Sequence, residues 1–332
     1  MKISVIICTF NRCESLRKVL ACIEELVVPA EVTWEVLVVD NNSRDHTRDV
    51  VESFITRAPE RFKYLFEKQQ GKAFALNAGL RAARGGIVAF TDDDVLIDRN
   101  WLSEILAAFH NYDCSGVGGI IVPVWAQRKP KWYATEGPFR VIGPIVEYDR
   151  GGEVCEITKP PCPWGANMAF MSDLFEKYGF FRTDLGPNPF NLMRGEDNEF
   201  GLRLIQGKER FLYVPGAVVY HPVDANRAKK RYFKSWYFNI GRASVRIHGL
   251  PSNVKYSVGV PRFYFRRLVE NWMRWGMAFN SHARFYHKMC FYKSLGELVE
   301  THYQFQKSRR SPLRERWPHM EEASQKSETT LR

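Results

Sequence analysis

Residues 2–42 decide the fold: KISVIICTFNRCESLRKVLACIEELVVPAEVTWEVLVVDNN. The segment opens with a mostly apolar run, Lys2–Ile7, continues through the turn CTFNR and ends with a second apolar run, Trp34–Val39. Between the two runs, apolar residues recur with helical spacing and share one face: Leu16, Val19, Leu20, Ile23 and Val27. The pattern predicts a strand–helix–strand unit with strands buried on both sides, which is typical of parallel sheets.

The alternation of strands and helices continues to residue 90. The further elements predicted are a helix after Ser43, a short strand at Tyr64–Phe66, an alanine-rich helix at Lys72–Arg84 that Gly85 and Gly86 end, and a buried strand at Ile87–Phe90. We expect Asn11 and Glu14 to form a capping box at the first helix, and Ser43 to cap the second. The fold class is therefore α/β, with a mostly parallel, Rossmann-like sheet and helices on both faces.

Beyond residue 125 the pattern loosens. Residues 125–165 are rich in Pro and Gly and predict an irregular, partly β segment with long loops. The elements expected after it are helices at Ser172–Tyr178 and Glu196–Gln206 and strands at Phe211–Val214 and Ala217–Tyr220. We expect one domain over residues 1–226, a mainly helical basic extension at 227–307 and a polar, disordered tail at 308–332.

Polar residues follow three of the predicted strands at the point where each strand ends. They are Thr9–Arg12, Asp40–Ser43 and Asp92–Asp94. Ligands of parallel sheets bind beyond the carboxyl ends of the strands, so we expect the three clusters to share one rim. Three clusters at one rim indicate a functional site more strongly than any one of them.

The run Asp92–Asp94 suggests a metal site. Adjacent carboxylates repel one another unless a cation lies between them, and hard oxygen ligands favour Mg²⁺ or Mn²⁺. The alternative is a solvated acidic turn that caps the helix near Asn100–Phe109.

Two further motifs have both a functional and a structural interpretation. The acidic cluster Gly195–Glu199 (GEDNE) begins an amphipathic helix. Its carboxylates either complement the helix dipole or remove a proton from an incoming hydroxyl group. His221, at a strand end before a proline, is either a metal ligand through its neutral imidazole or a structural histidine.

Seven short motifs occur in order over about residues 1–225: CTFNR, VVDNNSRD, GKAFALNAGL, FTDDDV, WGANMAF, GEDNEFGLRL and VVYHPV. Together they resemble the family 2 inverting glycosyltransferases, which have the GT-A fold of the nucleotide-diphospho-sugar transferases. The resemblance implies a metal-dependent enzyme that moves a sugar from a nucleotide-diphosphate donor, with a UDP-sugar preferred, to a hydroxyl group of a glycan or lipid-linked acceptor in surface or exopolysaccharide biosynthesis. It also divides the domain into a nucleotide-sugar half at about 1–122 and an acceptor half at about 123–226.

The resemblance assigns roles to individual residues. The residues that would contact the nucleotide or its phosphates are Thr9, Phe10, Asn11, Arg12, Asp40, Asn42, Lys72 and Asn77, with Ser43 nearby and with Asp92 and Asp93 facing the ribose and the donor sugar. The metal would be held by Asp94, which belongs to the DxD motif, together with Asp92 and His221. Trp164, Gly165 and Asn167 would lie beside the donor sugar and the acceptor. Asp197 matches the catalytic base, and Glu196 would support it or bind the acceptor.

The reaction that these parts imply is a single in-line displacement that inverts the anomeric carbon. A metal neutralises the charge on the leaving nucleotide diphosphate, and the base deprotonates the acceptor hydroxyl group. One alternative is a catalytically inactive nucleotide-sugar-binding or regulatory protein on the same fold, against which the intact acidic motifs and His221 argue. Another is a nucleotidyltransferase, which requires a glycine-rich phosphate loop near the N-terminus, and CTFNR has no glycine.

Charge is distributed unevenly along the chain. The 332 residues include 48 Lys and Arg against 37 Asp and Glu, a net charge of +11. Residues 1–226 hold 26 basic and 30 acidic residues, whereas 227–332 hold 22 and 7, with no acidic residue between Arg227 and Val269. The excess of positive charge therefore belongs to the C-terminal third alone.

The segment Pro261–Phe279 has the spacing of an amphipathic helix. Its apolar side is predicted to carry Phe265, Leu268, Val269, Trp272 and Phe279, and its basic side Arg262, Arg266, Arg267 and Arg274. We expect either peripheral contact of residues 227–307 with an anionic membrane or packing of this helix on the catalytic domain. No nucleic-acid-binding module is recognised, and we expect no nucleic-acid partner.

Cysteine usage and the N-terminus predict the compartment. The seven cysteines are an odd number without CxxC spacing, which is typical of reduced thiols. The N-terminal residues MKISVIICTF begin directly as a β-rich run, and no stretch of 18 uncharged apolar residues occurs. We expect a cytoplasmic protein, with peripheral attachment to the cytoplasmic face of the membrane as the further expectation.

Overall fold

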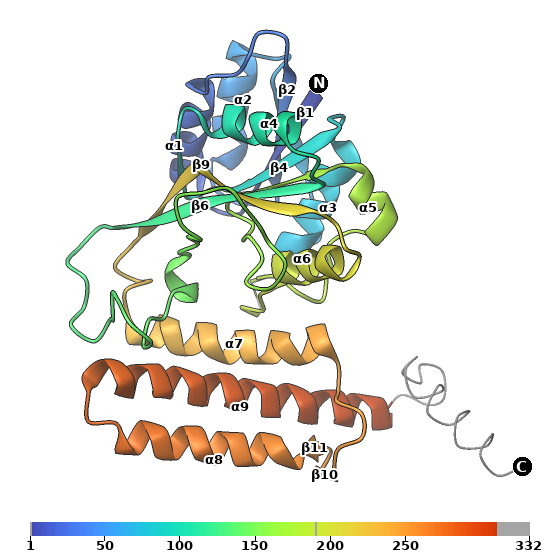
Figure 1. Ribbon diagram of the computed structural model, residues 1–332. Coiled ribbons are helices and arrows are strands. Elements are labelled where there is room, and N and C mark those ends of the chain that lie inside the picture. Colours follow the sequence, from blue (N-terminus) through green and yellow to red (C-terminus); the bar gives the residue numbers. More distant parts are fainter. Residues whose placement is uncertain (1, 190, 311–332) are drawn as a thin grey trace, which may run out of the picture. The chain divides into compact units, whose positions relative to one another are not determined.

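The computed structural model describes residues 2–189 and 191–310. Within these ranges the chain forms two compact units, the first ending at Trp236 and the second beginning at Tyr237. Figure 1 shows a sheet with helices in the first unit and a group of helices in the second. The division falls after the boundary that we expect at residue 226. Helix α7 (Lys230–His248) starts in the first unit and continues into the second.

The first unit is built around one mixed sheet. In the described part of the chain its strands are β1 (Lys2–Thr9), β2 (Thr33–Asp40), β3 (Phe62–Phe66), β4 (Ile87–Asp92), β5 (Leu96–Ile97), β6 (Gly116–Trp125), β7 (Cys155–Glu156), β8 (Met168–Met171) and β9 (Phe211–Val223). Their order across the sheet is β3-β2-β1-β4-β8-β6-β9-β5, with β7 paired to β9. The strands β3, β2, β1 and β4 are all parallel, whereas β8 runs antiparallel between β4 and β6.

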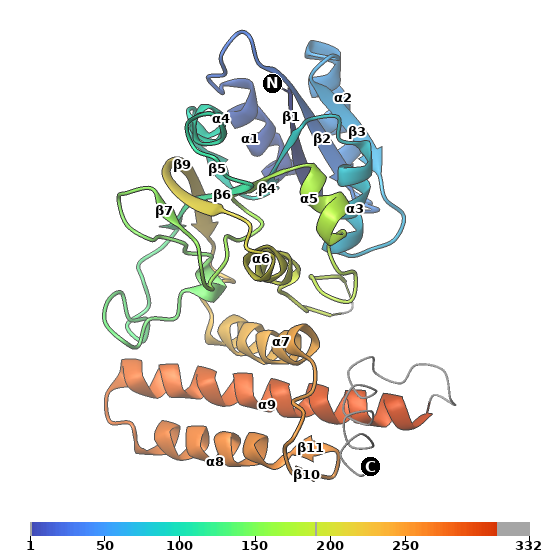
Figure 2. The same cartoon turned by 45° about the vertical axis from the view of Figure 1, so that its right-hand side comes forward.

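Helices cover both faces of this sheet. They are α1 (Cys13–Glu24), α2 (Thr47–Arg57), α3 (Lys72–Ala82), α4 (Trp101–Asn111), α5 (Asp173–Tyr178) and α6 (Glu196–Gln206), together with the short 3₁₀ helix η1 (Gly143–Ile145). In Figures 1 and 2, α1 and α4 lie on one side of β1 and β4, and α3 and α5 lie on the other. The predicted α/β class, with its helical C-terminal extension, is confirmed.

The core follows from the apolar runs of the sequence. Strand β2 is buried along its whole length after Thr33, because helices lie against both of its faces. Helix α1 buries Leu16, Val19, Leu20 and Ile23, as its spacing predicts. The fifth residue predicted for that face, Val27, lies beyond the end of the helix and is exposed.

The caps of the first two helices differ from the prediction. The capping box at Asn11 and the cap at Ser43 are both wrong, because these two side chains fasten the β1–α1 turn to the β2–α2 turn instead. The amide N–H of Asn11 donates to Ser43 Oγ at 2.9 Å. Asp45 satisfies donors at both helices, since its carboxylate accepts hydrogen bonds from the amide N–H groups of Cys13 (3.0 Å) and Thr47 (3.1 Å). Asp45, in the β2–α2 turn, therefore caps both α1 and α2.

Strand β9 is one element where two were predicted. Its pairing with β6 shifts in register where Pro215–Ala217 intervene, so that Val214 pairs with Gly119 and Val218 with Ile120. The strand then continues to Val223 and carries His221 within it. A bulge thus joins the two predicted strands into one.

The second unit consists of the later part of α7, α8 (Arg262–Met277), α9 (Ser281–Arg310) and the short hairpin β10 (Tyr256–Ser257)–β11 (Val260–Pro261). Helices α7 and α9 approach closely at two glycines, which present no side chain. A Cβ atom on Gly241 would lie 2.0 Å from the carbonyl oxygen of Lys293, and one on Gly296 would lie 2.0 Å from that of Phe238. Beside this crossing, the buried carboxylate of Glu300 accepts hydrogen bonds from both Arg242 and Arg246.

Three further expectations can be compared with the described residues. None of the described helices is both long enough and apolar enough to cross a bilayer. All seven cysteines lie in the described part of the chain and are free thiols, as predicted. Residues 308–310 still belong to α9, and the remainder of the predicted disordered tail, 311–332, lies outside the described residues.

Candidate active site

The carboxyl ends of the parallel strands surround a cavity of about 460 Å³. The register of the sheet sets the ends of the three strands level, with Thr9 beside Asp40 and Cys8 beside Asp92. The cavity is lined by Cys8, Thr9, Phe10, Arg12, Asn41, Gly71, Lys72, Ala75, Asp92, Asp93, Asp94, Pro187, Asn188, Pro189, Leu192, Arg194, Asp224, Asn226, Arg227 and Tyr232. The rim expected from the three polar clusters therefore exists, and a cavity opens at it.

An acidic group with one histidine lies at this cavity. Asp92 ends β4, and Asp94 follows it in the turn. His221 comes from β9, which is separated from β4 by the strands β8 and β6. One side-chain donor atom from each of the three lies within 4.8 Å of the others. His221 is buried, and desolvation together with the nearby Arg227 lowers its pKa, which favours the neutral imidazole that a metal ligand requires.

This set of donors fits a hard divalent cation. Two carboxylate oxygens and one imidazole nitrogen suit Mn²⁺ and Mg²⁺, whereas a soft ion such as Cu⁺ prefers the sulfur ligands that these three residues lack. The carboxylates of Asp92 and Asp94 each pair with a side-chain cation. These ion pairs stabilise the ionised carboxylates in a partly buried place where an unpaired charge would be unfavourable. The residues present therefore fit the metal that the motifs imply.

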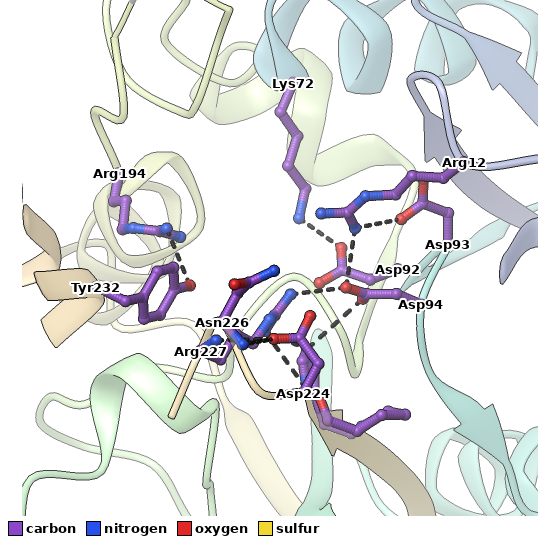
Figure 3. A network of polar contacts seen from close by, with 12 residues as sticks. Arg12, Lys72, Asp92, Asp93, Asp94, Arg194, Asp224, Asn226, Arg227 and Tyr232 are labelled. Carbon is purple, nitrogen blue, oxygen red and sulfur yellow. Dashed lines mark hydrogen bonds and ion pairs between the residues drawn. The ribbon is translucent and has the colours of Figure 1, made fainter. Parts of the chain in front are cut away.

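Two arginines reach the acidic turn from different sides (Figure 3). Arg12, from the β1–α1 turn, contacts Asp93 at 3.0 Å and Asp94 at 2.8 Å. Arg227 donates to Asp94 at 2.6 Å, and its other terminal nitrogen lies 3.0 Å from Nε2 of His221. Arg227 thus contacts two of the three residues, Asp94 and His221, that could hold a metal ion.

Burial and neighbouring charges set the protonation of Asp93. Desolvation and the adjacent carboxylates of Asp94 and Asp92 raise its pKa to about 6, although Arg12 acts in the opposite direction. Arg12 in turn has its pKa raised, chiefly by the charge of Asp93. The pair therefore carries its full charge only above the pH at which Asp93 ionises.

Lys72 connects the acidic turn to the second acidic cluster. Its ammonium group donates to Asp92 at 2.5 Å and is also attracted by Glu196 and Asp197. Burial alone would lower the pKa of Lys72, yet these carboxylates raise it. Desolvation disfavours the charged form of Asp92, but Lys72 outweighs it and lowers the pKa of that carboxylate. Both groups are therefore charged at neutral pH.

The position of Lys72 depends on a glycine and an asparagine. Gly71 precedes α3 with a φ of +142°, a conformation that residues with a side chain rarely adopt. The side chain of Asn41 accepts a hydrogen bond from the amide N–H of Gly71 at 2.7 Å and donates to the carbonyl oxygens of Glu67 and Gln69. Asn41 therefore fixes the loop that places the first residue of α3 in the cavity.

The second acidic cluster begins α6, after Gly195 in a left-handed conformation. Asp197 is half-buried and accepts hydrogen bonds from the amide N–H of Gly165 (2.9 Å) and of Asn198 (2.7 Å). Glu196 is buried, and desolvation together with the charge of Asp197 raises its pKa to about 7. The two adjacent carboxyl groups thus differ: Asp197 is the more accessible, whereas Glu196 is buried and has a raised pKa.

The structure brings only part of the predicted site together at the cavity. The predicted residues that line it are Thr9, Phe10, Arg12, Lys72, Asp92, Asp93 and Asp94. Those not among the lining residues are Asn11, Asp40, Asn42, Asn77, Trp164, Gly165, Asn167, Glu196, Asp197 and His221. Of the latter, Gly165, Glu196 and Asp197 are still grouped around Lys72, and His221 contacts Arg227.

Two predicted contact residues instead brace the fold. The amide group of Asn77 is buried and bonds both backbone groups of Phe181. The amide of Asn167 is buried as well, accepting from the indole N–H of Trp101 and donating to the carbonyl oxygens of Ile120 and Ala217. Their side chains are committed to these partners, so neither reaches the cavity in this structure.

Asp40 is likewise engaged below the rim. Its carboxylate accepts hydrogen bonds from the amide N–H of Ser43 at 2.9 Å and from the hydroxyl group of Tyr64 at 2.7 Å. The neighbouring Asn41 lines the cavity in its place. Asn42 has a left-handed φ of +67°, which turns the chain after β2.

Several lining residues were not predicted from the sequence. Arg194 directly precedes the GEDNE motif, and Arg227 follows His221 by six residues. Tyr232, in the first turn of α7, lies 3.4 Å from Arg194 (Figure 3). A basic residue close in sequence to each acidic or metal-binding motif is the signal by which the two arginines could have been found.

Comparison with known proteins finds similar sequences and structures. The family model for "Glycosyl transferase family 2" matches residues 4–179. The chain is 26% identical over 234 residues to the glucosyl-dolichyl phosphate glucuronosyltransferase of Haloferax volcanii, covering 69% of this chain and 72% of that protein. It is 25% identical over 258 residues to the succinoglycan biosynthesis protein ExoM of Rhizobium meliloti, covering 75% and 78%.

Among solved structures, a mannosyltransferase from Pyrobaculum calidifontis in complex with GDP-Man and Mn²⁺ has a TM-score of 0.54 to this chain. The match covers 99% of this chain and 80% of that one at 20% sequence identity. At this identity the likeness establishes the fold alone, which is the expected GT-A fold.

Proposed function

Because the chain belongs to glycosyl transferase family 2, we propose that it transfers a sugar, with inversion, from a nucleotide-diphosphate donor to a hydroxyl group of a glycan or lipid-linked acceptor. The observation that carries this proposal is the grouping of Asp92, Asp94 and His221 within 4.8 Å at the cavity. Beside it, Lys72 links this group to the carboxylates that begin α6. The site thus combines a place for a diphosphate with a nearby proton acceptor.

The donor diphosphate would bind between the acidic turn and the cations around it. Asp92, Asp94 and His221 would hold Mn²⁺ or Mg²⁺, which when bound neutralises the charge of the leaving diphosphate. Arg12, Lys72 and Arg227 carry the side-chain cations at the same cavity, and they would contact phosphate oxygens directly. We place the nucleoside against Thr9, Phe10 and Asn41, with Asp40 beneath, and we prefer uridine as the base.

We assign the base to Asp197. Its carboxylate is held in place by the amide N–H groups of Gly165 and Asn198, and it is more accessible than that of Glu196. It would accept the proton of the acceptor hydroxyl group as that oxygen attacks the anomeric carbon from the face opposite the diphosphate. Glu196 would support Asp197, because the two carboxyl groups share the field of Lys72.

The proposed class of acceptor is supported by the names of two relatives. One relative is named for glucosyl-dolichyl phosphate, a lipid-linked sugar, and another for succinoglycan biosynthesis. We propose an acceptor of this class, in surface or exopolysaccharide assembly, and a location at the cytoplasmic face of a membrane. Residues 1–122 would serve the donor, and the remainder of the first unit the acceptor.

The test is a panel of nucleotide sugars screened for Mn²⁺-dependent hydrolysis and transfer. Asp197→Asn is expected to lower kcat by about 100- to 10 000-fold, because the proton acceptor is lost. Its affinity for the donor, measured by calorimetry, is expected to stay close to that of the wild type. The matched control is Asp173→Asn, which changes an exposed aspartate at the start of α5 and should leave kcat unchanged.

Two outcomes would contradict the proposal at different points. Near-normal turnover in Asp197→Asn would remove Asp197 from the role of base and leave Glu196→Gln as the variant to examine. A wild-type protein that binds a nucleotide sugar but turns over none of the panel would favour the inactive, regulatory alternative.

A further inference from the structure

The outer face of α8 carries large apolar side chains that no described residue covers. The exposed fractions are 51% for Val269, 60% for Trp272, 45% for Met273 and 72% for Met277, and Phe279, just beyond the helix end, is fully exposed. Trp272, Met273 and Met277, with Trp275 and Gly276, also line a hollow on this surface. An apolar patch of this kind on a folded protein indicates a surface that binds a partner.

The opposite face of α8 is the one that packs against α9. Tyr264 and Asn271 are buried there, and the amide of Asn271 donates to Ser294 Oγ at 2.9 Å. Arg267 also belongs to this packed side, since it pairs with Glu297 and stacks over Tyr264. Arg267 therefore lies beside α9, although 43% of its side chain remains exposed. Within the second unit α8 thus packs against α9 through one face, and its outer face remains exposed.

Positive charge surrounds the exposed patch. Arg262 and Arg266 precede it at helical spacing on the same face, and Arg274 flanks it. Arg284 lies at the turn that follows, because its Nε donates to the carbonyl oxygen of Ala278 at 3.1 Å. The one carboxylate within α8, Glu270, lies 3.5 Å from Arg266.

The second unit as a whole also carries a large excess of positive charge. Residues 237–310 contain 13 Lys and Arg against 3 Glu, and each of those glutamates has an arginine within 4 Å. A second copy of this surface would bring like charges together, so charge complementarity disfavours self-association. An anionic surface that also accepts apolar side chains satisfies both features, and a lipid bilayer with acidic headgroups has this chemistry.

We propose that the exposed face of α8 is a docking surface for an anionic membrane. The helix lies in the plane of the interface, with Trp272, Met277 and Phe279 inserted among the acyl chains and Arg262, Arg266, Arg274 and Arg284 at the headgroups. Residues 269–277 span about 12 Å along the helix, which suits a shallow interfacial contact and is too short for a crossing. The proposal does not depend on the catalytic assignment and can fail while that assignment holds.

The test uses the full chain and sedimentation with vesicles of phosphatidylcholine, either pure or mixed with phosphatidylglycerol. The wild type is expected to bind the mixed vesicles and to be weakly bound by the pure ones, with binding reduced at high salt. The triple variant Trp272→Ser, Met277→Ser, Phe279→Ser is expected to lose at least about 100-fold in partition coefficient. Because all three side chains are exposed, its thermal unfolding midpoint should match that of the wild type.

The matched control is Val299→Ser with Tyr303→Ser, which removes exposed apolar side chains of α9 in the same unit and should leave vesicle binding unchanged. Trp272→Phe, which keeps an aromatic ring, should bind nearly as the wild type does. A second pair, Arg262→Gln with Arg274→Gln, should reduce the preference for mixed vesicles over pure ones.

Three results would overturn the proposal. The first is a wild type that binds neither vesicle, and the second is a folded triple variant that binds as well as the wild type. The third is a wild type that is dimeric by light scattering while the triple variant is monomeric, since the face would then be an interface between copies of this chain.

Discussion

Arg227 contacts two of the residues that we propose to hold a metal ion. Its guanidinium group lies 2.6 Å from Asp94 and 3.0 Å from Nε2 of His221, two of the three donors that would hold the metal. A divalent ion held by these residues would meet the positive charge of this guanidinium group. We therefore expect binding of the ion to displace Arg227, which would then be free to contact a phosphate of the donor.

This competition gives a prediction about metal affinity. Arg227→Met removes the competing cation and is expected to tighten Mn²⁺ binding by about five- to tenfold in the absence of donor. The measurement is a titration of free Mn²⁺ by electron paramagnetic resonance. Lys229→Met is the control, because that exposed lysine contacts Asn226 in the same loop. Equal or weaker Mn²⁺ binding in Arg227→Met would show that the two cations do not compete.

Adjacent like charges were the feature of the sequence that predicted cavity-lining residues most directly. Three adjacent carboxylates have few stable arrangements without a cation, so Asp92–Asp94 predicted a site, and the three residues line the same cavity. Asn77 and Asn167 were assigned to ligand contacts because they occur in family motifs, yet their amides satisfy buried backbone groups. A motif position does not reveal whether a polar side chain faces a ligand or the core, because both environments need hydrogen bonds.

At the scale of elements, apolar runs predicted most of the strands and the starts of α3 and α6, whereas the predicted caps of α1 and α2 were wrong. A buried strand is specified by its own side chains, so its sequence is sufficient to find it. A cap depends on which polar group the fold brings near, and Asp45 reaches both α1 and α2 only once β1 and β2 are paired. Local spacing, on which the capping box at Asn11 was predicted, carries no such information.

The glycine contact between α7 and α9 gives a prediction at this scale. Gly241→Ala would place a Cβ atom 2.0 Å from the carbonyl oxygen of Lys293, so the helices must separate. We expect the free energy of unfolding to fall by at least about 2 kcal/mol. Urea denaturation followed by circular dichroism measures this change.

The control for that variant is Gly276→Ala in α8. A Cβ atom there meets nothing within 4 Å, so the substitution should stabilise the helix by about 0.5–1 kcal/mol. If Gly241→Ala were as stable as Gly276→Ala, the close approach of α7 and α9 would not be required for folding.

At the scale of the whole molecule, the uneven charge was visible in the sequence but its structural boundary was not. The compact first unit extends to Trp236 and so includes the five basic residues between Arg227 and Lys234. Residues 1–236 then hold 31 basic against 30 acidic residues, while 237–310 hold 13 against 3. Composition cannot separate Arg227, which faces carboxylates in the cavity, from arginines that face solvent.

The same pairing of charges predicts how the protein responds to a chelator. Asp92, Asp93 and Asp94 are partnered by Lys72, Arg12 and Arg227, so removing an ion leaves no carboxylate of the turn without a cation. With EDTA we expect turnover to cease, while unfolding stays cooperative and its midpoint falls by no more than about 5 °C. Differential scanning calorimetry with and without EDTA measures this, and adding Mn²⁺ back should restore turnover. Loss of the calorimetric transition in EDTA would show that the ion holds the fold together.

The three cations around the acidic turn thus have a consequence for the life of the protein in a cell. A zinc finger that loses its ion unfolds and becomes a target for proteases. Here Arg12, Lys72 and Arg227 already neutralise the carboxylates of the acidic turn, so we expect a shortage of the proposed ion to stop turnover while the protein stays folded. Recovery from such a shortage would then need only resupply of the ion, without new synthesis of the protein.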